Sequence, residues 1–252
     1  MTKYAVLYHC HPINNGLWHL EYFLKHGFHP DVHFYIACVD FEPPDDLANI
    51  KFFQVENDSH DFGGFARLLL EHVPVANYEY FGFFNSSCLG PASVSNSKRM
   101  WLEYFSDRLV NNIGICGATI NCLGSKSPYF HYLEKLLDPS VTHYHVQTYA
   151  YMLSQSAVNL LLRKKFYAYP TKWTKEETIV NYEIGLSKML LREGFQLSCL
   201  LKAYANLDYS QRTPETESLE LIGDPCFINT SGGATIDARE VLFIKPSRGF
   251  KL

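Results

Sequence analysis

Apolar runs of six to nine residues alternate with amphipathic stretches over most of the chain up to about residue 166. The apolar runs predict β-strands at residues 4–9, 32–40, 50–56, 79–84, 113–120 and 145–153. The amphipathic stretches predict helices at residues 15–27, 61–72, 97–110 and 154–166. Strands that alternate with helices of this length predict an α/β fold, with a mixed, mostly parallel sheet and helices on both faces.

The remainder of the chain departs from this alternation. Asn181 is the predicted N-cap of a helix that ends before Gly194, which would place Glu183 in its first turn. Polar residues dominate 206–220 and predict a flexible loop or lid, with short strands beyond it at 225–229 and 239–245. We therefore predict one domain, with its core in residues 1–205 and with the lid loop and C-terminal strands of 206–252 as a small appendage that completes it.

Composition and charge restrict the class of protein. The 252 residues are 47% hydrophobic, which allows a sizeable core, and the net charge of −4 without a basic block argues against binding nucleic acid through its phosphates. No apolar run reaches the roughly 20 residues of a transmembrane helix. The seven cysteines lack a CxxC pair and indicate a reducing compartment. Because a predicted strand follows Met1 closely, without a signal peptide, we expect a cytoplasmic protein.

Polar side chains follow the predicted strands, at the points where those strands end. They lie at 9–14, at Asp40, at 57–64 and in the triplet Asn85-Ser86-Ser87, which directly follows an aromatic strand. In an open α/β sheet, ligands bind outside the carboxyl ends of the strands, so we expect these side chains to form one site. The backbone N–H groups of Gly63-Gly64, at the predicted helix start, would favour binding of an anion. The alternative is that the two glycines form an ordinary turn from loop to helix.

Three charged residues late in the chain are candidates for the same site. Glu183 at a helix start can act as a general base on a sugar hydroxyl, or can simply stabilise its own helix. Lys245 and Arg248 follow a short apolar run into a turn that contains Pro246. Placed over a cleft, these two cations would neutralise a leaving diphosphate, and otherwise they are a solvated basic tail.

Four blocks of the chain together resemble glycosyltransferases of the GT-A fold, and most closely the rhamnan synthesis protein F-like family of bacterial and viral polysaccharide transferases. The blocks occur in the family's order and are DFGGFARLL (61–69), YFGFFNSSCLGP (80–91), HVQTYAYMLS (145–154) and NYEIGLSKMLLREGF (181–195). The resemblance implies a GT-A, Rossmann-like architecture.

The resemblance also implies an activity, which is transfer of a sugar, rhamnose or another hexose, from a nucleotide-diphosphate sugar to a glycan acceptor with inversion. The nucleotide would be UDP, GDP or dTDP. Glu183 would be the general base that takes the acceptor proton. The residues expected to bind the donor are His9, Asp61, Gly63, Arg67, Asn85, Ser86, Ser87, Gln147, Lys245 and Arg248.

Ser86 departs from the family pattern, in which an Asp usually occupies this position. A hard divalent cation prefers carboxylate oxygens, and the triplet Asn85-Ser86-Ser87 has none. Either Mn²⁺ or Mg²⁺ binds weakly through Asn85, Ser87, a neighbouring acid and the diphosphate, or Lys245 and Arg248 replace the metal. We favour the second alternative and therefore expect activity without an essential metal cofactor.

Other interpretations remain open. A catalytically inactive GT-A-like protein that binds a glycan or nucleotide is favoured by the missing carboxylates and opposed by Glu183. A zinc site at the alternating pairs His9/His11 and His143/His145 lacks an evident third ligand. A nucleotidyltransferase would need a Gly-rich basic loop after the first strand, which HCHPINNG (9–16) does not supply.

Overall fold

The computed structural model describes residues 3–93, 98–124, 127, 129, 144–168 and 173–252. The strands are β1 (Tyr4–Cys10), β2 (Val32–Cys38), β3 (Ile50–Gln54), β4 (Tyr80–Asn85), β5 (Ile113–Gly117), β6 (Ile120–Cys122), β7 (Tyr144–Val146), β8 (Ala150–Ser154) and β9 (Gln196–Cys199). The α-helices are α1 (Gly16–Gly27), α2 (His60–Arg67), α3 (Trp101–Ser106), α5 (Gln155–Arg163), α6 (Lys175–Thr178), α7 (Gly185–Arg192), α8 (Pro214–Ile222) and α9 (Ala238–Val241). Two π-helical segments, η2 (Leu68–His72) and η4 (Ile179–Ile184), continue α2 and α6, and the 3₁₀ turns are η1 (Ile13–Asn15), η3 (Val75–Asn77) and η5 (Pro246–Arg248).

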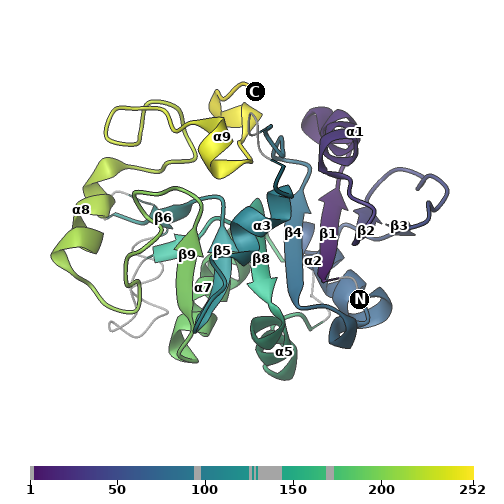
Figure 1. Cartoon of the computed structure of the whole chain (residues 1–252), viewed down its shortest axis with the longest axis horizontal. Coiled ribbons are helices and arrows are strands. Elements are labelled where there is room, and N and C mark those ends of the chain that lie inside the picture. Colours follow the sequence, from purple (N-terminus) through teal and green to yellow (C-terminus); the bar gives the residue numbers. More distant parts are fainter. Residues whose placement is uncertain (1–2, 94–97, 125–126, 128, 130–143, 169–172) are drawn as a thin grey trace.

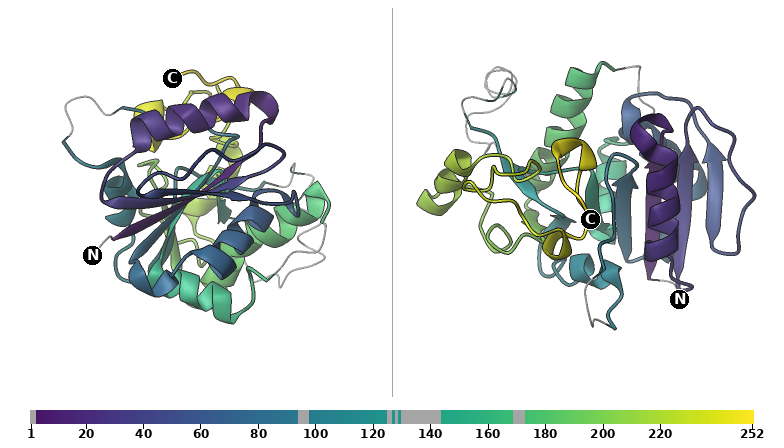
Figure 2. Two further views of the ribbon diagram at one scale, coloured as in Figure 1. Left: turned by 90° about the vertical axis from the view of Figure 1, so that its right-hand side faces the viewer. Right: turned by 90° about the horizontal axis from the view of Figure 1, so that it is seen from above.

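Seven strands form the main sheet in the order β3-β2-β1-β4-β8-β5-β9 (Figure 1). Six of them run in one direction, and β8 alone is antiparallel to its neighbours β4 and β5. Helices cover both faces, with α1 on one side and α2 and α5 on the other (Figure 2). The fold class predicted from the sequence, an α/β protein with a mixed, mostly parallel sheet and helices on both faces, is confirmed.

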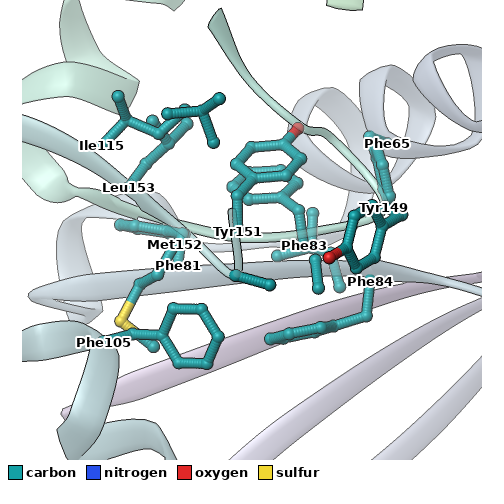
Figure 3. Packing of buried hydrophobic residues seen from close by; sticks show 14 of the residues in the cluster. Phe65, Phe81, Phe83, Phe84, Phe105, Ile115, Tyr149, Tyr151, Met152 and Leu153 are labelled. Atoms are coloured by element: carbon teal, nitrogen blue, oxygen red, sulfur yellow. The ribbon is translucent and has the colours of Figure 1, made fainter. Parts of the chain in front are cut away.

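The aromatic run of β4 is continuous because both faces of this strand are buried. Phe83 and Phe84 point to opposite faces, as successive residues of a strand must. Phe83 stacks on Tyr151, its cross-strand partner in β8, with ring centroids 4.8 Å apart (Figure 3). On the other face, Phe84 packs against Phe243 and Trp101. The C-terminal segment therefore shares the core of the sheet.

Two predicted strands are each divided in the structure. The apolar stretch 113–120 gives β5 and then β6, and 145–153 falls into β7 and β8. β6 and β7 pair with each other as a separate two-stranded antiparallel sheet. Apolar periodicity cannot locate such a division, because tertiary pairing decides where a strand leaves the sheet. β9 was not predicted, and residue 97 of the predicted helix 97–110 lies outside the described residues.

The prediction of strands at 225–229 and 239–245 is wrong. Residues 225–229 form turns, and the second stretch begins as α9 because the Asp237 side chain accepts a hydrogen bond from the Arg239 N–H at 2.9 Å. Leu242 has a positive φ of 62° and ends that helix. Ile244 then forms a single β-bridge with Leu89, which joins the C-terminal segment to the turn after β4.

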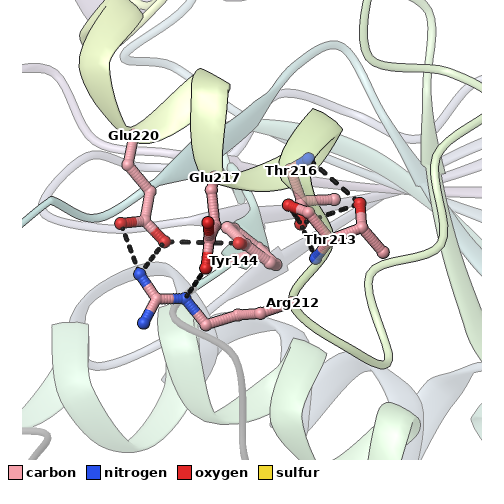
Figure 4. A network of polar contacts seen from close by, with 6 residues as sticks. All are labelled: Tyr144, Arg212, Thr213, Thr216, Glu217 and Glu220. Atoms are coloured by element: carbon pink, nitrogen blue, oxygen red, sulfur yellow. Dashed lines mark hydrogen bonds and ion pairs between the residues drawn. The ribbon is translucent and has the colours of Figure 1, made fainter.

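The predicted flexible loop at 206–220 contains most of a helix, α8, and is anchored (Figure 4). Thr213 caps α8 by accepting a hydrogen bond from the Thr216 N–H. The Arg212 guanidinium binds the Glu220 carboxylate at 2.9 and 3.0 Å, and the Tyr144 hydroxyl of β7 donates to the same carboxylate at 3.2 Å. These contacts attach α8 to the smaller sheet. Within the described part of the chain, no helix combines the length and apolar character needed to cross a bilayer.

Candidate functional site

A cleft of about 690 Å³ opens at the carboxyl ends of β1 and β4. The loops after β1, β3 and β4 converge on it, as the sequence predicted. Asp40, which was predicted with them, is outside the lining and lies 3.0 Å from Nε2 of His11. The helix that contains Glu183 and the segment 245–247 also line the cleft. The lining residues are His9, His11, Ile13, Asn14, Asn15, His19, Asn57, His60, Asp61, Asn85, Ser86, Ser87, Lys175, Thr178, Glu183, Lys245, Pro246 and Ser247.

Ser86 holds the loop after β1 in place. Its hydroxyl accepts a hydrogen bond from the His11 N–H at 3.0 Å and donates to the His11 carbonyl at 3.1 Å. Its own carbonyl lies 2.7 Å from Nδ1 of His19. The side chain is buried, and an ionised carboxylate cannot donate to a carbonyl. The absence of an Asp at position 86 therefore has a structural reason in this chain.

Asn85 links the end of β4 to α2. Its Nδ2 donates to an Asp61 carboxylate oxygen at 2.7 Å. Its Oδ1 accepts from both the N–H and the hydroxyl of Ser87, at 3.1 and 2.5 Å. The amide of Asn85 thus orients a carboxylate on one side and a hydroxyl on the other. Both Asp61 and Ser87 line the cleft.

Two carboxyl groups in the cleft have raised pKa values. Burial raises the pKa of Asp61, although the hydrogen bond from Asn85 and the charge of Lys245 oppose the shift. The pKa of Glu183 is raised to about 7, first by burial and then by the negative charge of Asp61. Lys245, Lys175 and, more weakly, other cations act in the opposite direction. Glu183 can therefore accept or release a proton near neutral pH.

Glu183 does not lie in the first turn of a helix, and the predicted Asn181 cap is wrong. The helix begins after Thr174, whose Oγ1 accepts from the Glu177 N–H at 3.2 Å while the Glu177 carboxylate accepts from the Thr174 N–H at 2.8 Å. This capping box, readable in the sequence as Thr174-x-x-Glu177, is the signal that the prediction overlooked. Glu183 instead lies in the π-helical segment η4, and such segments occur frequently at functional sites.

Of the two predicted cations, only Lys245 lines the cleft. Its Nζ lies 5.4 Å from the ring centroid of Tyr149. Arg248 is exposed and its guanidinium covers the Phe227 ring at 3.9 Å, outside the lining, although its charge still lowers the pKa of Glu183. Lys175, in the first turn of α6, lines the cleft and was not predicted. The capping box at Thr174 would have placed it at a helix start.

Three further predicted donor residues are outside the cleft lining. Arg67 contacts Asp58 at 3.4 Å and Glu71 at 3.9 Å. Gln147 accepts from the Thr119 hydroxyl at 2.5 Å and donates to Asp224 at 3.0 Å. Gly63 lies inside α2 rather than before it, and its N–H faces the Ser59 carbonyl at 3.4 Å. The Gly63-Gly64 pair therefore does not form the predicted anion site at a helix start.

His9 and Gly64 are packed in contact below the cleft. A Cβ on Gly64 would lie 2.5 Å from Cδ2 of His9, so glycine is needed for α2 to approach β1 this closely. Burial lowers the pKa of His9 to about 3, and the ring is neutral at physiological pH. Its Nε2 is buried and has no hydrogen-bond partner among the described residues.

The polar side chains at the end of β4 form hydrogen bonds within the protein. Asn85 and Ser87 bond to each other, and Asp61 is the carboxylate next to them. No group of three or more His, Cys, Asp or Glu side chains able to hold a metal ion occurs within the described ranges. His143, part of the zinc alternative, lies outside those ranges. All seven cysteines are buried and unpaired, in agreement with their role as small apolar residues in and beside the strands.

No protein-family model matches the chain, and no curated protein matches it in sequence. Among solved structures, the mannosyltransferase Ktr4p from S. cerevisiae matches with a TM-score of 0.41 and 10% identity, over 75% of this chain and 65% of that one. The mannosyltransferase PcManGT from Pyrobaculum calidifontis, in complex with GDP-Man and Mn²⁺, matches with the same TM-score and identity, over 77% of this chain and 53% of that one. The match spans less than two thirds of either neighbour. The resemblance to the rhamnan synthesis protein F-like family is not confirmed.

Proposed function

We propose that the chain is a glycosyltransferase of the GT-A type that moves a sugar from a nucleotide-diphosphate sugar to a glycan acceptor. The observation that carries this proposal is the pairing, in one cleft, of a carboxyl group whose pKa is about 7 with two lysine ammonium groups. A general base is most effective when its pKa lies near the working pH. Cations in the same cleft are suited to the charge of a leaving diphosphate.

Glu183 is the proposed base. It takes the proton of an acceptor hydroxyl as that oxygen forms a bond to the anomeric carbon of the donor sugar. The bond from this carbon to the diphosphate breaks in the same step, and the sugar is transferred with inversion. The negative charge that develops on the diphosphate is balanced by Lys245 and Lys175, both of which line the cleft. In this proposal Lys175, rather than Arg248, is the second cation that balances the charge of the leaving diphosphate.

The donor is bound by the polar groups at the carboxyl ends of β1 and β4. Asp61, oriented by Asn85, is the proposed partner of the sugar hydroxyls. Ser87 is the proposed partner of the diphosphate. His9 contributes a neutral ring to the floor. A cleft of about 690 Å³ is within the range of sites that enclose a ligand of this size. UDP, GDP and dTDP remain candidates for the nucleotide, and rhamnose or another hexose for the sugar.

Mn²⁺ or Mg²⁺, when present, would be held chiefly by the diphosphate itself, because Asp61 is the one carboxylate bonded to the Asn85 amide among the described residues and no group of three potential ligands occurs there. No step above depends on such an ion. The charge of the leaving group is balanced by the protein's own lysines.

A panel of nucleotides and nucleotide sugars tests the proposal. A donor that binds the folded state raises the melting temperature, and the same donor should lose its sugar slowly to water or to an added oligosaccharide. Glu183→Gln should keep the melting shift and lose the turnover by about 10²-fold or more. Lys251→Ala, an exposed change near the C-terminus, is the matched control and should alter neither.

A second candidate function is a catalytically inactive binding protein. The observation in its favour is that the side chains of Asn85, Ser86 and Ser87 are already engaged in hydrogen bonds within the protein. The same panel distinguishes the two. A melting shift without turnover by the wild type would support the binding protein, and absence of any shift across the panel would contradict both.

A further inference from the structure

Tyr149 is a buried neighbour of the cleft that contacts Lys245. It is only 3% exposed and is not part of the cleft lining. Nζ of Lys245 lies 5.4 Å from the centroid of the Tyr149 ring, within the distance at which the negative face of an aromatic ring attracts a cation. Within the described part of the chain, the lysines that form ion pairs are Lys3, Lys51 and Lys164. No carboxylate of that part therefore pairs with Lys245, and the ring is its partner.

A chain of hydrogen bonds fixes the Tyr149 ring at its hydroxyl. The Thr119 hydroxyl donates its single proton to Oε1 of Gln147 at 2.5 Å, so the Tyr149 hydroxyl, 3.1 Å from the same Thr119 oxygen, is the donor of that contact. Nε2 of Gln147 donates in turn to the Asp224 carboxylate at 3.0 Å. Because the ring is buried and bonded at its far end, its face stays at one place next to the cleft.

The end of β4 and the turn after it hold the backbones next to both partners. The carbonyl of Tyr149 accepts a hydrogen bond from the Asn85 N–H at 3.3 Å. Ile244, which precedes Lys245, exchanges two backbone hydrogen bonds with Leu89, at 2.8 and 3.1 Å. Asn85 ends β4 and Leu89 lies four residues later, so the ring and the ammonium group extend from backbones that are joined through one short segment.

We propose that Tyr149 is a positioning residue, whose ring face holds the ammonium group of Lys245 in the cleft, where it faces the leaving diphosphate. The part played in transfer rests on the proposed function, whereas the placement of Lys245 does not. A lysine head group on its flexible four-carbon stem would otherwise extend into water. The ring attracts the cation without cancelling its charge, which a carboxylate in the same place would do. The full positive charge therefore remains available to an anion.

Titration of the Glu183 carboxyl reports where this ammonium group lies. Burial raises the pKa of Glu183 to about 7, and the charge of Lys245 opposes the shift. NMR of the glutamate carboxyl carbons, with Glu183→Gln to assign the signal, measures the midpoint on the whole chain without a substrate. Tyr149→Leu should raise the midpoint by most of the shift that Lys245→Ala causes. Tyr149→Phe keeps the ring and should titrate like the wild type.

Two controls separate positioning from a change in packing. In the double variant Tyr149→Leu/Lys245→Ala, loss of the ring should shift the midpoint no further than Lys245→Ala alone, because the cation is already absent. Tyr78→Leu removes an equally buried tyrosine at the amino end of β4, whereas the cleft opens at the carboxyl end, and should leave the midpoint unchanged. A wild-type midpoint in Tyr149→Leu, or a shift of equal size with and without Lys245, would overturn the proposal.

Titration of the same variants with UDP, GDP and dTDP tests the link to transfer. A nucleotide that binds the wild type should bind Tyr149→Leu roughly tenfold more weakly and Tyr149→Phe equally well. Unchanged affinity in Tyr149→Leu would overturn the role of Tyr149 at the diphosphate. Failure of all three nucleotides to bind the wild type would instead contradict the proposed function, and the Glu183 titration would still decide whether the ring holds Lys245.

Discussion

Replacement of Glu183 by Gln should make the protein more stable, by an amount that depends on pH. The pKa of this carboxyl is about 7 in the folded chain, against 4.5 for an unperturbed glutamate. A carboxyl whose folded pKa is raised contributes stability that is fully present below the unfolded value and is lost as pH rises through the folded value. Gln is neutral at every pH and nearly isosteric, so it avoids this loss.

The size of the effect follows from the two pKa values. A difference of about 2.5 units corresponds to about 3 kcal/mol of unfolding free energy. The advantage of Glu183→Gln should be close to zero at pH 4, about 1 kcal/mol at pH 5, about 2 kcal/mol at pH 6, and constant at about 3 kcal/mol from pH 8 upward. The pH window of the change therefore lies between the unfolded value of 4.5 and the folded value of about 7.

Urea unfolding of the wild type and of Glu183→Gln at each unit of pH from 4 to 9 measures this difference without knowledge of the substrate. The other titrating groups are common to both proteins and cancel in the comparison. Glu56→Gln, which changes an exposed glutamate outside the cleft lining, is the matched control and should show no comparable trend. A free-energy difference that stays constant with pH would refute the conclusion that burial and the charge of Asp61 raise the pKa of Glu183 to about 7.

Three further predictions follow from the site. Lys245→Ala should weaken nucleotide-diphosphate binding roughly tenfold to a hundredfold in a titration. It should also move the acidic limb of the pH–rate profile to higher pH, because Lys245 lowers the pKa of Glu183. An unchanged affinity would argue against a role of Lys245 in binding the diphosphate. Gly64→Ala should destabilise the fold by about 1–3 kcal/mol in urea, since the new Cβ would lie 2.5 Å from the His9 ring; wild-type stability would show that α2 can move away. Transfer activity measured in EDTA should be largely retained, and complete loss restored by manganese would contradict metal-independent charge balance.

The sequence predicted the parts of this fold that depend on local pattern. The aromatic run of β4 and the polar triplet after it predicted a buried strand that ends at a site, and the structure has a cleft at that end, because parallel strands of an open sheet place their carboxyl ends at one edge. The division between β7 and β8 was not predictable in this way. It depends on pairing with β6 and β5, which are distant in sequence.

The candidate site shows the same limit. Glu183 was predicted from its place near a helix start and from the resemblance to a family motif. The predicted helix start at Asn181 was wrong, because the helix is capped at Thr174, several residues earlier. Lys245 and Arg248 are three residues apart and cannot be distinguished by sequence. The bridge between Leu89 and Ile244 places the first of them in the cleft, and the Phe227 ring holds the second outside the lining. Both contacts are long-range.

The π-helical segment η4 has a consequence for how this chain tolerates changes in length. It separates α6, which brings Lys175 and Thr178 to the cleft, from α7, which packs Leu186 and Leu190 into the core. A π-helical turn contains more residues than an α-helical one. Deletion of a single residue within 179–184 would allow an uninterrupted α-helix, and because the π-helical turn holds about one residue more than an α-helical turn, α6 and α7 would keep nearly the same relative rotation. A one-residue shortening here would thus leave Lys175 at the cleft while α7 keeps its packing.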